Sequence, residues 1–576
     1  MNRPMRKVAV AIGILFLALF VNLNVVQVVQ GNSLSSNPDN RRVLLNEYSN
    51  PRGQIVVTGT AVAESKATND ELKYRRVYPK GPVYAPVTGY FSFTYGSTGI
   101  ESAENSILTG DDPRLFTTKL TDILTGRDPR GGSVVLTVNK AAQEAAYAAM
   151  DGRPGAVVAL DPRTGAILAD VSTPSYDPNA LSSHNADEIA HAYNCYVELD
   201  TTQRRGETRA QLRMRIHHQL QVRERTCKNV PNDPTSYFRQ NPYAISPLSN
   251  KAFRQIYPAG SMFKIIDSAA ALSLPGGGIT PSTSIPAPNS YWPLEPQRTT
   301  ACSSTSTSGG PCIENFDGEV CQNGKTATLD YAFAKSCNTA FAELAVNKLG
   351  GSTIADEAHK FGFDRPYPGQ GPPDFCDPPA LRTPLSVCRS TPGSVSDLHS
   401  PDTLAQTAIG QHDVGITPLQ AAMLSAAVAN NGTLMRPYLV AKELGPNLSP
   451  LPHPPPQQLS QVIDPSLDAD MIQMMEDVVT SPEGTGGDAN ITELPSVTVG
   501  GKTGTADHCA SNSATHCPPP DAWFTGFALK QGQPKIAVAV ILENGGVNGN
   551  ETTGGLAAAP VAKKVMLAYL RSPAGS

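Results

Sequence analysis

A serine and a lysine three residues apart are the first pair in this sequence that could do chemistry. In the stretch YPAGSMFKII, Ser261 and Lys264 follow a Pro-x-Gly turn and begin an apolar run. In a helix such positions share one face, so the lysine amine would lie near the serine hydroxyl. A serine hydroxyl becomes nucleophilic when a neighbouring base takes its proton. Lysine can be that base only where burial or positive charge lowers its pKa.

The bare Ser-x-x-Lys pattern is weak, because it arises by chance about once or twice in a chain of this length. Its alternative explanation is a helix-capping serine beside an exposed lysine. A second element favours catalysis. Ser336-Cys337-Asn338 lies in the short break between two helical patterns, where side chains can point into a cleft. The Ser336 hydroxyl could relay a proton there, and the Asn338 amide could hold a substrate amide.

A third element lies near the C-terminus, where Lys502, Thr503, Gly504 and Thr505 follow two glycines on an expected strand. A cation and two hydroxyls beside a glycine, where the backbone can approach closely, suit a substrate carboxylate. The backbone amides of Thr505 and Ser261 could together form an oxyanion hole. The three elements together predict acyl transfer through a serine.

Hydrophobic patterning indicates which elements must position these groups. Two strands, 156–160 and 166–172, are joined by a tight turn, and three further strand candidates (VTVGGKTGTA, AWFTGFALK and KIAVAVILEN) follow one another near the end. Helices are expected at 263–274, 326–335, 339–349 and 554–571. Strands at both ends with helices between them predict an α/β fold, in which helices pack on one sheet.

The N-terminus has the pattern of a membrane anchor. Arg3, Arg6 and Lys7 precede the span 8–29, which is about one bilayer thickness at helical rise. Its uninterrupted apolar part, 8–21, would also suit a secretory signal peptide, but no Ala-x-Ala-like cleavage site follows. Positive charges before a span hold the N-terminus in the cytoplasm. We therefore expect a single-pass protein of the cell membrane with its body on the extracytoplasmic side.

Length and composition predict a globular protein of two or three domains. The chain has 576 residues, of which 40% are hydrophobic and 17% charged, and its net charge is −5. That charge argues against a nucleic-acid partner, which usually needs a basic surface. The ten histidines are scattered and no Cys-x-x-Cys pair occurs, so we expect no metal site and no cofactor.

The cysteines agree with an oxidising compartment. All ten can be grouped into pairs of neighbours in the sequence, for which disulfides are plausible, although spacing does not determine connectivity. These pairs are Cys195 with Cys227, Cys302 with Cys312, Cys321 with Cys337, Cys376 with Cys388, and Cys509 with Cys517. The alternative is a set of buried thiols without disulfides.

Changes in sequence texture divide the chain into three segments. Residues 1–30 form the cytoplasmic tip and anchor, 31–154 have the short strands and loops of a small spacer domain, and 155–573 form the main domain. Within the main domain, residues 192–241 form an arginine-rich excursion, and its apolar residues at every fourth position predict an amphipathic helix. A charge run is usually a solvated face, and a partner-binding surface is the alternative.

The motifs Ser-x-x-Lys, Ser-x-Asn and Lys-Thr-Gly, in this order, resemble the active-site set of penicillin-binding proteins and serine β-lactamases. The stretches VVALDPRTGAILADVSTPSYDPN, FAKSCNTAFAELA, IGQHDVGITPLQAAMLSAAVANNGTLMRPYLV and AWFTGFA look like a class B penicillin-binding transpeptidase. Nearer the N-terminus, RVLLNEYSNPRGQI and YAPVTGYFSFTYGSTGIE resemble the actinobacterial penicillin-binding protein A subfamily. The resemblance spans nearly the whole chain.

This resemblance implies a penicillin-binding, serine β-lactamase-like transpeptidase domain, with a mainly antiparallel sheet and helices on both faces. It makes Ser261 the acylated nucleophile, Lys264 its general base and Ser336 a proton relay. The implied substrate-binding residues are Asn338, Lys502, Thr503, Gly504 and Thr505. The implied reaction cross-links peptidoglycan stem peptides that end in D-Ala-D-Ala, and β-lactams would acylate the same serine. Cell-division or wall-synthesis proteins are the implied partners.

Related functions remain as alternatives. A D,D-carboxypeptidase uses the same motifs with water as the acceptor, and one class of β-lactamase deacylates through a Glu-x-x-x-Asn loop. Glu443 and Asn447 have that spacing, but they lie far downstream in the sequence, in a Pro-rich connection that is expected to be exposed. A non-catalytic division scaffold would be expected to lose one of the three motifs, and all three are intact here.

The sequence departs from the family pattern at a few positions. Met262 stands where threonine is usual and Ala259 where a second proline is common, and both should be tolerated. Cys337 lies inside the second motif, which is an unusual place for a thiol. A disulfide from Cys337 to Cys321 would brace the loop that carries this motif.

Overall fold

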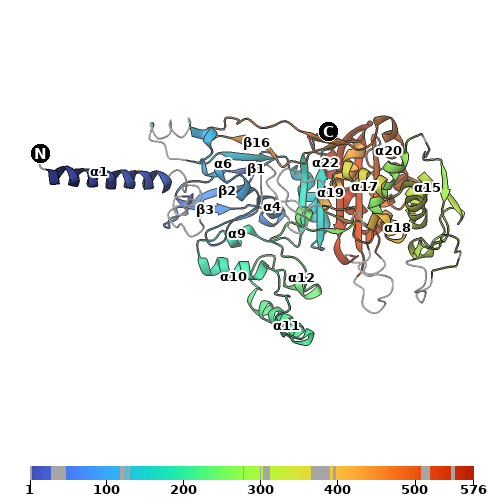
Figure 1. Ribbon diagram of the computed structural model, residues 1–576, viewed down its shortest axis with the longest axis horizontal. Helices are drawn as coiled ribbons and strands as arrows, with labels where there is room; N and C mark the ends of the chain where they lie inside the picture. Colours follow the sequence, from blue (N-terminus) through green and yellow to red (C-terminus); the bar gives the residue numbers. More distant parts are fainter. Residues whose placement is uncertain are drawn as a thin grey trace.

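The computed structural model places two sheet-bearing domains behind a projecting N-terminal helix (Figure 1). The smaller domain lies next to this helix, and the larger domain carries the C-terminus. The described residues are 3–26, 47–116, 125, 130–276, 278–298, 300–302, 312–364, 390–393, 397–506, 519–545 and 552–575.

Helix α1 (Arg3–Asn24) projects away from the rest of the molecule (Figure 1). Its large apolar side chains are exposed, Leu15 and Phe16 among them. The sequence predicted a membrane anchor in this segment. Within the described residues, however, no helix has both the length and the apolar character needed to cross a membrane.

The larger domain is built on a five-stranded sheet in the order β18-β19-β20-β7-β8. Its strands are β7 (Gly155–Leu160), β8 (Ile167–Thr173), β18 (Val497–Ala506), β19 (Asp521–Lys530) and β20 (Gln533–Leu542). All neighbours are antiparallel, and β20 pairs with β7, so the two opening strands and the three closing strands meet in one sheet. All five predicted strands are present, and most of their residues are buried, as expected of a sheet that is covered on both faces.

Helices cover both faces of this sheet. Along β7, alternate residues enter different cores: Val158 contributes to one and Val157 to the other. Helix α19 (Pro418–Ala429) packs on the first face, whereas α22 (Ala559–Leu570) and α8 (Lys140–Met150) pack on the second. Helix α8 lies in the segment that the sequence analysis assigned to the spacer, although it packs on the sheet of the larger domain. The domain limits drawn from the sequence stay a prediction.

The helices expected around the motifs are present with shifted bounds. Helix α14 (Lys264–Leu272) follows the first motif, while α15 (Leu329–Lys335) and α16 (Asn338–Leu344) flank the second. Helix α15 begins later than expected because β13 (Thr326–Thr328) pairs with β10 (Ser284–Pro286). The expected C-terminal helix is divided into α21 (Gly554–Ala557) and α22.

The smaller sheet has five strands in the order β16-β6-β1-β2-β3. Its strands are β1 (Ile55–Val57), β2 (Thr60–Ala67), β3 (Tyr74–Val77), β6 (Ser133–Leu136) and β16 (Val440–Leu444). β6 runs parallel to β1, and the other neighbours are antiparallel. Four strands come from the N-terminal part of the chain, so β16 returns from the main domain to complete the sheet.

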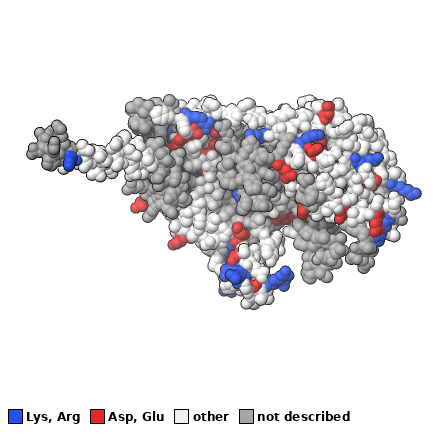
Figure 2. Space-filling view, viewed as in Figure 1, with Lys and Arg blue, Asp and Glu red and all other residues white. Residues whose placement is uncertain are grey.

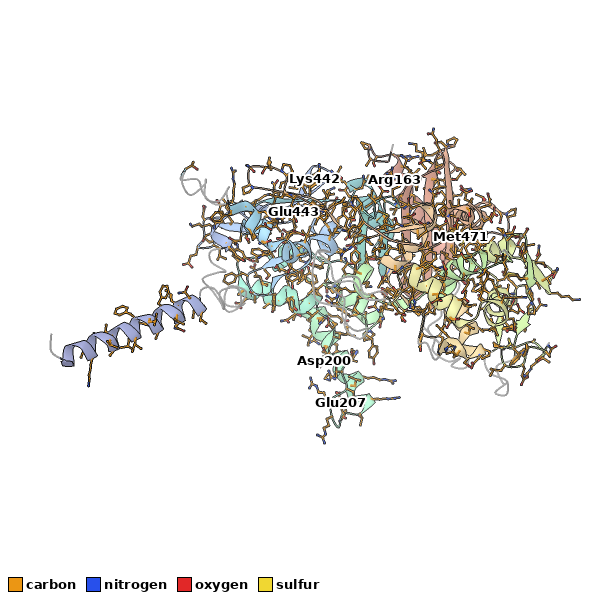
Figure 3. The ribbon with its side chains drawn as sticks, turned by 45° about the horizontal axis from the view of Figure 1, so that its top comes forward. Arg163, Asp200, Glu207, Lys442, Glu443 and Met471 are labelled. Atoms are coloured by element: carbon orange, nitrogen blue, oxygen red, sulfur yellow. A yellow bond between two sulfur atoms is a disulfide. The ribbon has the colours of Figure 1, made fainter. Side chains whose placement is uncertain are left out.

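The expectation that Glu443 lies in an exposed connection is wrong. Glu443 lies on β16 (Figure 3), where strand register places it opposite Val134 of β6. It is only 8% exposed, and its Oε2 lies 2.5 Å from Nη1 of Arg114. Pairing with the edge of the smaller sheet buries this side chain, whereas Asn447 lies in an exposed turn beyond the strand.

The arginine-rich excursion forms a protruding lobe of helices (Figure 1). Its helices are α10 (Ala186–Tyr196), which begins just before it, α11 (Arg209–Thr226) and α12 (Thr235–Gln240). The predicted amphipathic helix is confirmed, because Leu212, Ile216 and Leu220 of α11 are buried with Phe238 in a small core of their own. The lobe therefore has its own apolar interior.

Part of the excursion's charge is used within the lobe. Arg215 pairs with Asp200 at 2.7 Å and with Glu207 at 3.0 Å, and Figure 3 labels both carboxylates. Arg213 and Arg225 have exposed side chains, and Figure 2 shows Lys and Arg atoms on the surface of this lobe. A basic, solvated face is therefore present, and a partner for it stays a prediction.

Further elements connect these layers. The helices are α4 (Gly81–Thr88), α5 (Gly99–Ala103), α6 (Asn105–Thr109), α9 (Pro178–Leu181), α13 (Lys251–Arg254), α17 (Gly351–Lys360), α18 (Pro401–Ala408) and α20 (Pro465–Thr480). The short strands are β4 (Phe91–Ser92), β5 (Gly96–Ser97), β9 (Tyr257–Pro258), β11 (Ser290–Tyr291), β12 (Ile313–Glu314), β14 (Gly415–Ile416), β15 (Thr433–Met435) and β17 (Gln458–Gln461).

Candidate active site

The first motif lies where a short turn becomes a helix. Ser261 is part of the 3₁₀ turn η3 (Gly260–Phe263), which leads directly into α14. Nζ of Lys264 donates a hydrogen bond to Oγ of Ser261 at 3.1 Å, and the Lys264 side chain is fully buried. Neither helical segment has a side-chain cap at its N-terminus. The structure therefore shows neither a capping serine nor an exposed lysine at this motif.

The second motif bridges two helices and meets both lysines. Ser336 ends α15 with a left-handed backbone (φ 64°), and Asn338 begins α16. This turn lets the Ser336 hydroxyl accept hydrogen bonds from Nζ of Lys264 (3.3 Å) and Nζ of Lys502 (2.8 Å). Lys264 also donates to the Ser336 carbonyl and to Oδ1 of Asn338, each at 2.7 Å. Nδ2 of Asn338 donates to the Glu314 carbonyl at 3.0 Å, which orients the amide.

The third motif lies on β18. Lys502 is fully buried, and its Nζ donates to the Thr503 carbonyl at 3.2 Å as well as to Ser336. The Thr503 hydroxyl lies 2.6 Å from the hydroxyl of Thr485. Because β18 is held along its whole length by β19, with Gly504 opposite Trp523, these groups are fixed on a rigid strand.

Two glycines let the nucleophile turn approach this strand. Gly260 has a φ of +53°, and a Cβ there would lie 2.8 Å from the Thr505 carbonyl oxygen. Its amide donates to the Gly410 carbonyl at 2.9 Å, and a Cβ on Gly410 would lie 1.8 Å from the Gly260 carbonyl oxygen. A side chain at either position would displace the turn. The glycines therefore hold Ser261 against the strand that carries the third motif.

Burial determines the protonation of both lysines. Burial, followed by the nearby charge of Lys502, holds the pKa of Lys264 well below its usual range, although Asp267 opposes this shift. Burial lowers the pKa of Lys502 to about 7. A neutral lysine amine can accept a proton from a neighbouring hydroxyl. Lys264 therefore has the electrostatic setting of a general base.

Asp267 is a buried carboxyl on the same helix, one turn after Lys264. It is fully buried, and neither of its oxygens has a hydrogen-bond partner within the described part of the chain. Burial raises its pKa well above the usual range, and the Lys264 charge only partly opposes this. Burial therefore favours the neutral form of this carboxyl, which weakens it as a counter-charge for Lys264. In the sequence, the buried position of Asp267 is indicated only by its place as a lone aspartate in the apolar run KIIDSAAAL.

The three motifs open onto one cleft of about 480 Å³. Its lining includes Ser261, Ser336, Asn338, Thr503, Gly504 and Thr505. Lys264 and Lys502 are buried behind this lining, where they reach the hydroxyls without contacting solvent. A cleft of this size can hold the end of a peptide. Among the described residues, no three His, Cys, Asp or Glu side chains come together as metal ligands.

The structure joins three of the five predicted cysteine pairs. The observed disulfides are Cys195–Cys227, Cys302–Cys312 and Cys321–Cys337. The Cys321–Cys337 bridge touches the site, because Cys337 separates Ser336 from Asn338 and both cysteines line the cleft.

The other two predicted pairs are not among the observed disulfides. Cys376 and Cys388, which the sequence paired with each other, both lie outside the described residues. Cys509 and Cys517 also lie outside them. A disulfide between Cys376 and Cys388, and another between Cys509 and Cys517, therefore stay predictions.

Sequence reasoning missed two residues that support the motifs. Thr485, which follows α20, lines the cleft, and besides meeting Thr503 it donates its amide to the Ala334 carbonyl at 3.3 Å. Asn315 also lines the cleft and accepts from the amide of Thr339 at 3.1 Å. The only local signal at Thr485 is the glycine-rich stretch EGTGG, which by itself indicates no more than a turn.

The fold and the three motifs on one cleft define a serine enzyme of the penicillin-interacting class. Residues 155–567 match the family described as the penicillin-binding protein transpeptidase domain, and residues 52–134 match the penicillin-binding protein A dimerisation domain. The chain belongs to the penicillin-binding protein transpeptidase family. The family predicted from the motifs is thus confirmed.

Within this family the chain is similar to mycobacterial penicillin-binding protein A. The peptidoglycan D,D-transpeptidase PbpA of Mycolicibacterium smegmatis is 39% identical over 99% of both chains. PbpA of Mycobacterium tuberculosis is 37% identical, also over 99% of both chains. The structure of the M. tuberculosis protein as a ceftriaxone acyl-enzyme complex has 37% identity and a TM-score of 0.72, covering 92% of this chain and 100% of that chain. Its penicillin G acyl-enzyme complex has 37% identity and a TM-score of 0.69, with 91% and 100% coverage.

Proposed function

We propose that this chain is a peptidoglycan D,D-transpeptidase that forms an acyl-enzyme on Ser261. The observation that carries the proposal is the meeting of two fully buried lysines on the Ser336 hydroxyl, with one of them 3.1 Å from Ser261. The names of the PbpA relatives and the β-lactam acyl-enzymes of M. tuberculosis penicillin-binding protein A support the same reaction.

In the first step Oγ of Ser261 attacks the carbonyl carbon of the D-Ala-D-Ala amide. Nζ of Lys264 takes the hydroxyl proton as the O–C bond forms, and the amides of Ser261 and Thr505 stabilise the oxyanion. The C–N bond then breaks, and the proton passes from Lys264 through the Ser336 hydroxyl to the departing amine. D-alanine leaves, and Lys264 is neutral again.

The third motif and Asn338 hold the donor peptide in this scheme. Lys502, Thr503 and Thr505 bind the terminal carboxylate, and Gly504 lets the peptide lie close to β18. The Asn338 side-chain amide binds a backbone amide of the substrate. Because these groups lie on β18 and at the start of α16, they position the scissile bond over Ser261.

In the second step an amine of a neighbouring stem peptide attacks the ester carbonyl. A new amide bond forms, the ester C–O bond breaks, and the amine proton returns to Oγ of Ser261. β-Lactams follow the first step by opening their ring amide, whose leaving nitrogen stays attached, so the acyl-enzyme is long-lived. The position of Glu443 in the smaller sheet, paired with Arg114, argues against a β-lactamase deacylation loop.

The domain organisation predicted from the sequence completes the proposal. Residues 1–30 anchor the chain in the cell membrane, 31–154 form the spacer, and 155–573 form the transpeptidase domain on the extracytoplasmic side. The exposed apolar side chains of α1 support the anchor. Cell-division or wall-synthesis proteins are the proposed partners, and no nucleic acid is expected to bind.

A donor-acceptor assay tests the function. The full chain is incubated with a stem-peptide thioester and an amine acceptor, and amide and acid products are separated by mass. A transpeptidase forms the amide in proportion to acceptor concentration, and Ser261→Ala forms neither product. The acid alone would identify a carboxypeptidase, fast hydrolysis of added penicillin would identify a β-lactamase, and no turnover at all would favour the scaffold.

A further inference from the structure

We propose that Glu543 is a positioning residue for Ser261, which it holds in place through the hydroxyl of Tyr257. Glu543 follows β20, is not among the residues that line the cleft and belongs to none of the three motifs. The inference rests on the proposed function, because its readout is acylation of Ser261.

Glu543 is the centre of a buried polar cluster at the end of the large sheet. Its Oε1 accepts from the Tyr257 hydroxyl at 2.7 Å and lies 2.8 Å from Nζ of Lys251. Its Oε2 accepts from the Tyr237 hydroxyl at 3.4 Å. Lys251 is fully buried, and its Nζ lies 4.6 Å from the centre of the Tyr237 ring. One carboxylate thus organises a lysine and two tyrosines.

Tyr257 can only donate to this carboxylate. Burial, followed by the Glu543 charge, raises the pKa of Tyr257 well above its usual range, so its hydroxyl keeps its proton. Burial lowers the pKa of Lys251, whereas the Glu543 charge opposes this shift. A hydrogen bond to a carboxylate is stronger than one between two neutral groups. The Tyr257–Glu543 bond is therefore a firm attachment point.

Tyr257 transmits this attachment to the nucleophile turn. It lies on β9, which leads through Ala259 into η3, and β9 pairs with β14. Nε1 of Trp523 donates to the Pro258 carbonyl at 3.2 Å, and the Tyr257 and Trp523 rings contact edge to face at 5.7 Å. Few rotatable bonds separate this anchored segment from Ser261, and small displacements of a reacting atom slow acyl transfer strongly.

Tyr237 offers a matched control. It donates to the same carboxylate, but it lies on α12 of the arginine-rich excursion, between α11 and the main domain (Figure 1). Loss of its hydroxyl removes the longer of the two tyrosine contacts with Glu543, 3.4 Å against 2.7 Å, and leaves β9 attached. General loosening of the cluster would slow acylation in both tyrosine variants, whereas a positioning role slows it only where β9 loses its attachment.

The experiment compares Tyr257→Phe, Tyr237→Phe and Glu543→Gln in the full chain with the unaltered protein. Penicillin acylation is followed over a concentration series, which separates the saturating rate constant from the half-saturating concentration, and melting temperature is measured in parallel. We expect Tyr257→Phe to lower the saturating rate constant roughly tenfold with little change in half-saturation. Tyr237→Phe should keep the rate constant, and Glu543→Gln should lower it at least as much as Tyr257→Phe.

A normal acylation rate in Tyr257→Phe would overturn the inference, whatever its melting temperature. Equal rate losses in both tyrosine variants would also overturn it, because they would indicate general loosening. If Glu543→Gln does not fold, the comparison of the two tyrosine variants still tests the positioning role. Absence of acylation in the unaltered protein is a different result, because it would overturn the proposed function and the positioning role with it.

Discussion

Two groups of buried charge in this molecule are built in opposite ways. In the smaller domain, Arg52 and Arg76 are almost fully buried, and each donates to the Glu101 carboxylate at 2.6 Å. In the cleft, Lys264 and Lys502 are fully buried, and their hydrogen bonds run to neutral hydroxyl, carbonyl and amide oxygens. The first group is charge-paired, whereas neither cleft lysine forms an ion pair with a carboxylate in the part of the chain that the structure describes.

The pKa shifts show what this difference means. Burial would raise the pKa of Glu101, but the charges of Arg76 and Arg52 together hold it below its ordinary value, which favours the ionised carboxylate. The same burial, without a carboxylate partner, lowers the pKa of both cleft lysines. Paired buried charges fix a structure, whereas unpaired ones can exchange protons near neutral pH.

The largest expected effect is the loss of acylation in Lys264→Met. Removing the base should slow penicillin acylation about 10²- to 10⁴-fold, while the free energy of unfolding stays the same or rises, because a buried amine without a counter-charge is removed. Stopped-flow acylation and urea unfolding measure the two quantities. Lys335→Met is the control, since Lys335 lines the cleft but pairs with Glu319 at 3.1 Å. Normal acylation in Lys264→Met would contradict the role of this cleft lysine as the base.

For the charge-paired group, Glu101→Gln should have the opposite effect to Lys264→Met, with lower stability and unchanged acylation. This variant leaves two buried guanidinium groups without a carboxylate, so the free energy of unfolding should fall by about 3–5 kcal/mol. The acylation rate of the folded protein should not change, because Glu101 lies outside the cleft. Urea unfolding measures the loss. A loss below about 1 kcal/mol, the usual value of an exposed pair, would show that Glu101 is not the centre of the cluster.

Loss of the Cys321–Cys337 bridge should moderately lower both the free energy of unfolding and the rate of acylation. Replacing both cysteines by alanine removes a constraint over 16 residues, which costs up to about 3 kcal/mol, and it should slow acylation because the second motif loses its brace. The matched control replaces Cys195 and Cys227, which should lower stability alone. Acylation rates and unfolding curves separate the two variants. An intact mass equal to that of the fully reduced chain would exclude the bridge itself.

The smallest expected effects lie in the pH profile of acylation. Below the lowered pKa of Lys264 the amine is protonated, so the rate should fall about tenfold per pH unit on the acid side. Above a pKa of about 7 Lys502 loses its charge, so donor binding should weaken on the alkaline side, less steeply if the bound carboxylate raises that pKa. Lys502→Arg keeps the charge at every accessible pH. The fall in acylation at alkaline pH should therefore disappear in Lys502→Arg. An unchanged fall would show that another group causes it.

Much of the transpeptidase fold could be predicted because its information is local. The apolar runs of β19 and β20 indicate buried strands, and the spacing of Ser261 and Lys264 indicates one helical face. The three motifs could be assigned to one site because their order matches a known family. Local pattern was also sufficient for the amphipathic helix α11.

What could not be predicted depends on contacts between distant segments. β16 is short and of mixed polarity, and nothing in VAKEL indicates that it joins a sheet formed by the N-terminal part of the chain. The approach of Gly260 to Gly410 and the pairing of Lys251 with Glu543 likewise join segments far apart in sequence. The burial of Lys264 and Lys502, on which their chemistry depends, is a property of the assembled core.

The most direct test of the central claim is the intact mass of the full chain after incubation with penicillin, measured beside Ser261→Ala. We predict one covalently bound penicillin on the unaltered protein, persisting for many minutes, and none on Ser261→Ala. An adduct of equal size on Ser261→Ala would show that another residue is the nucleophile. No adduct on either protein would contradict the assignment of this cleft as an acyl-transfer site.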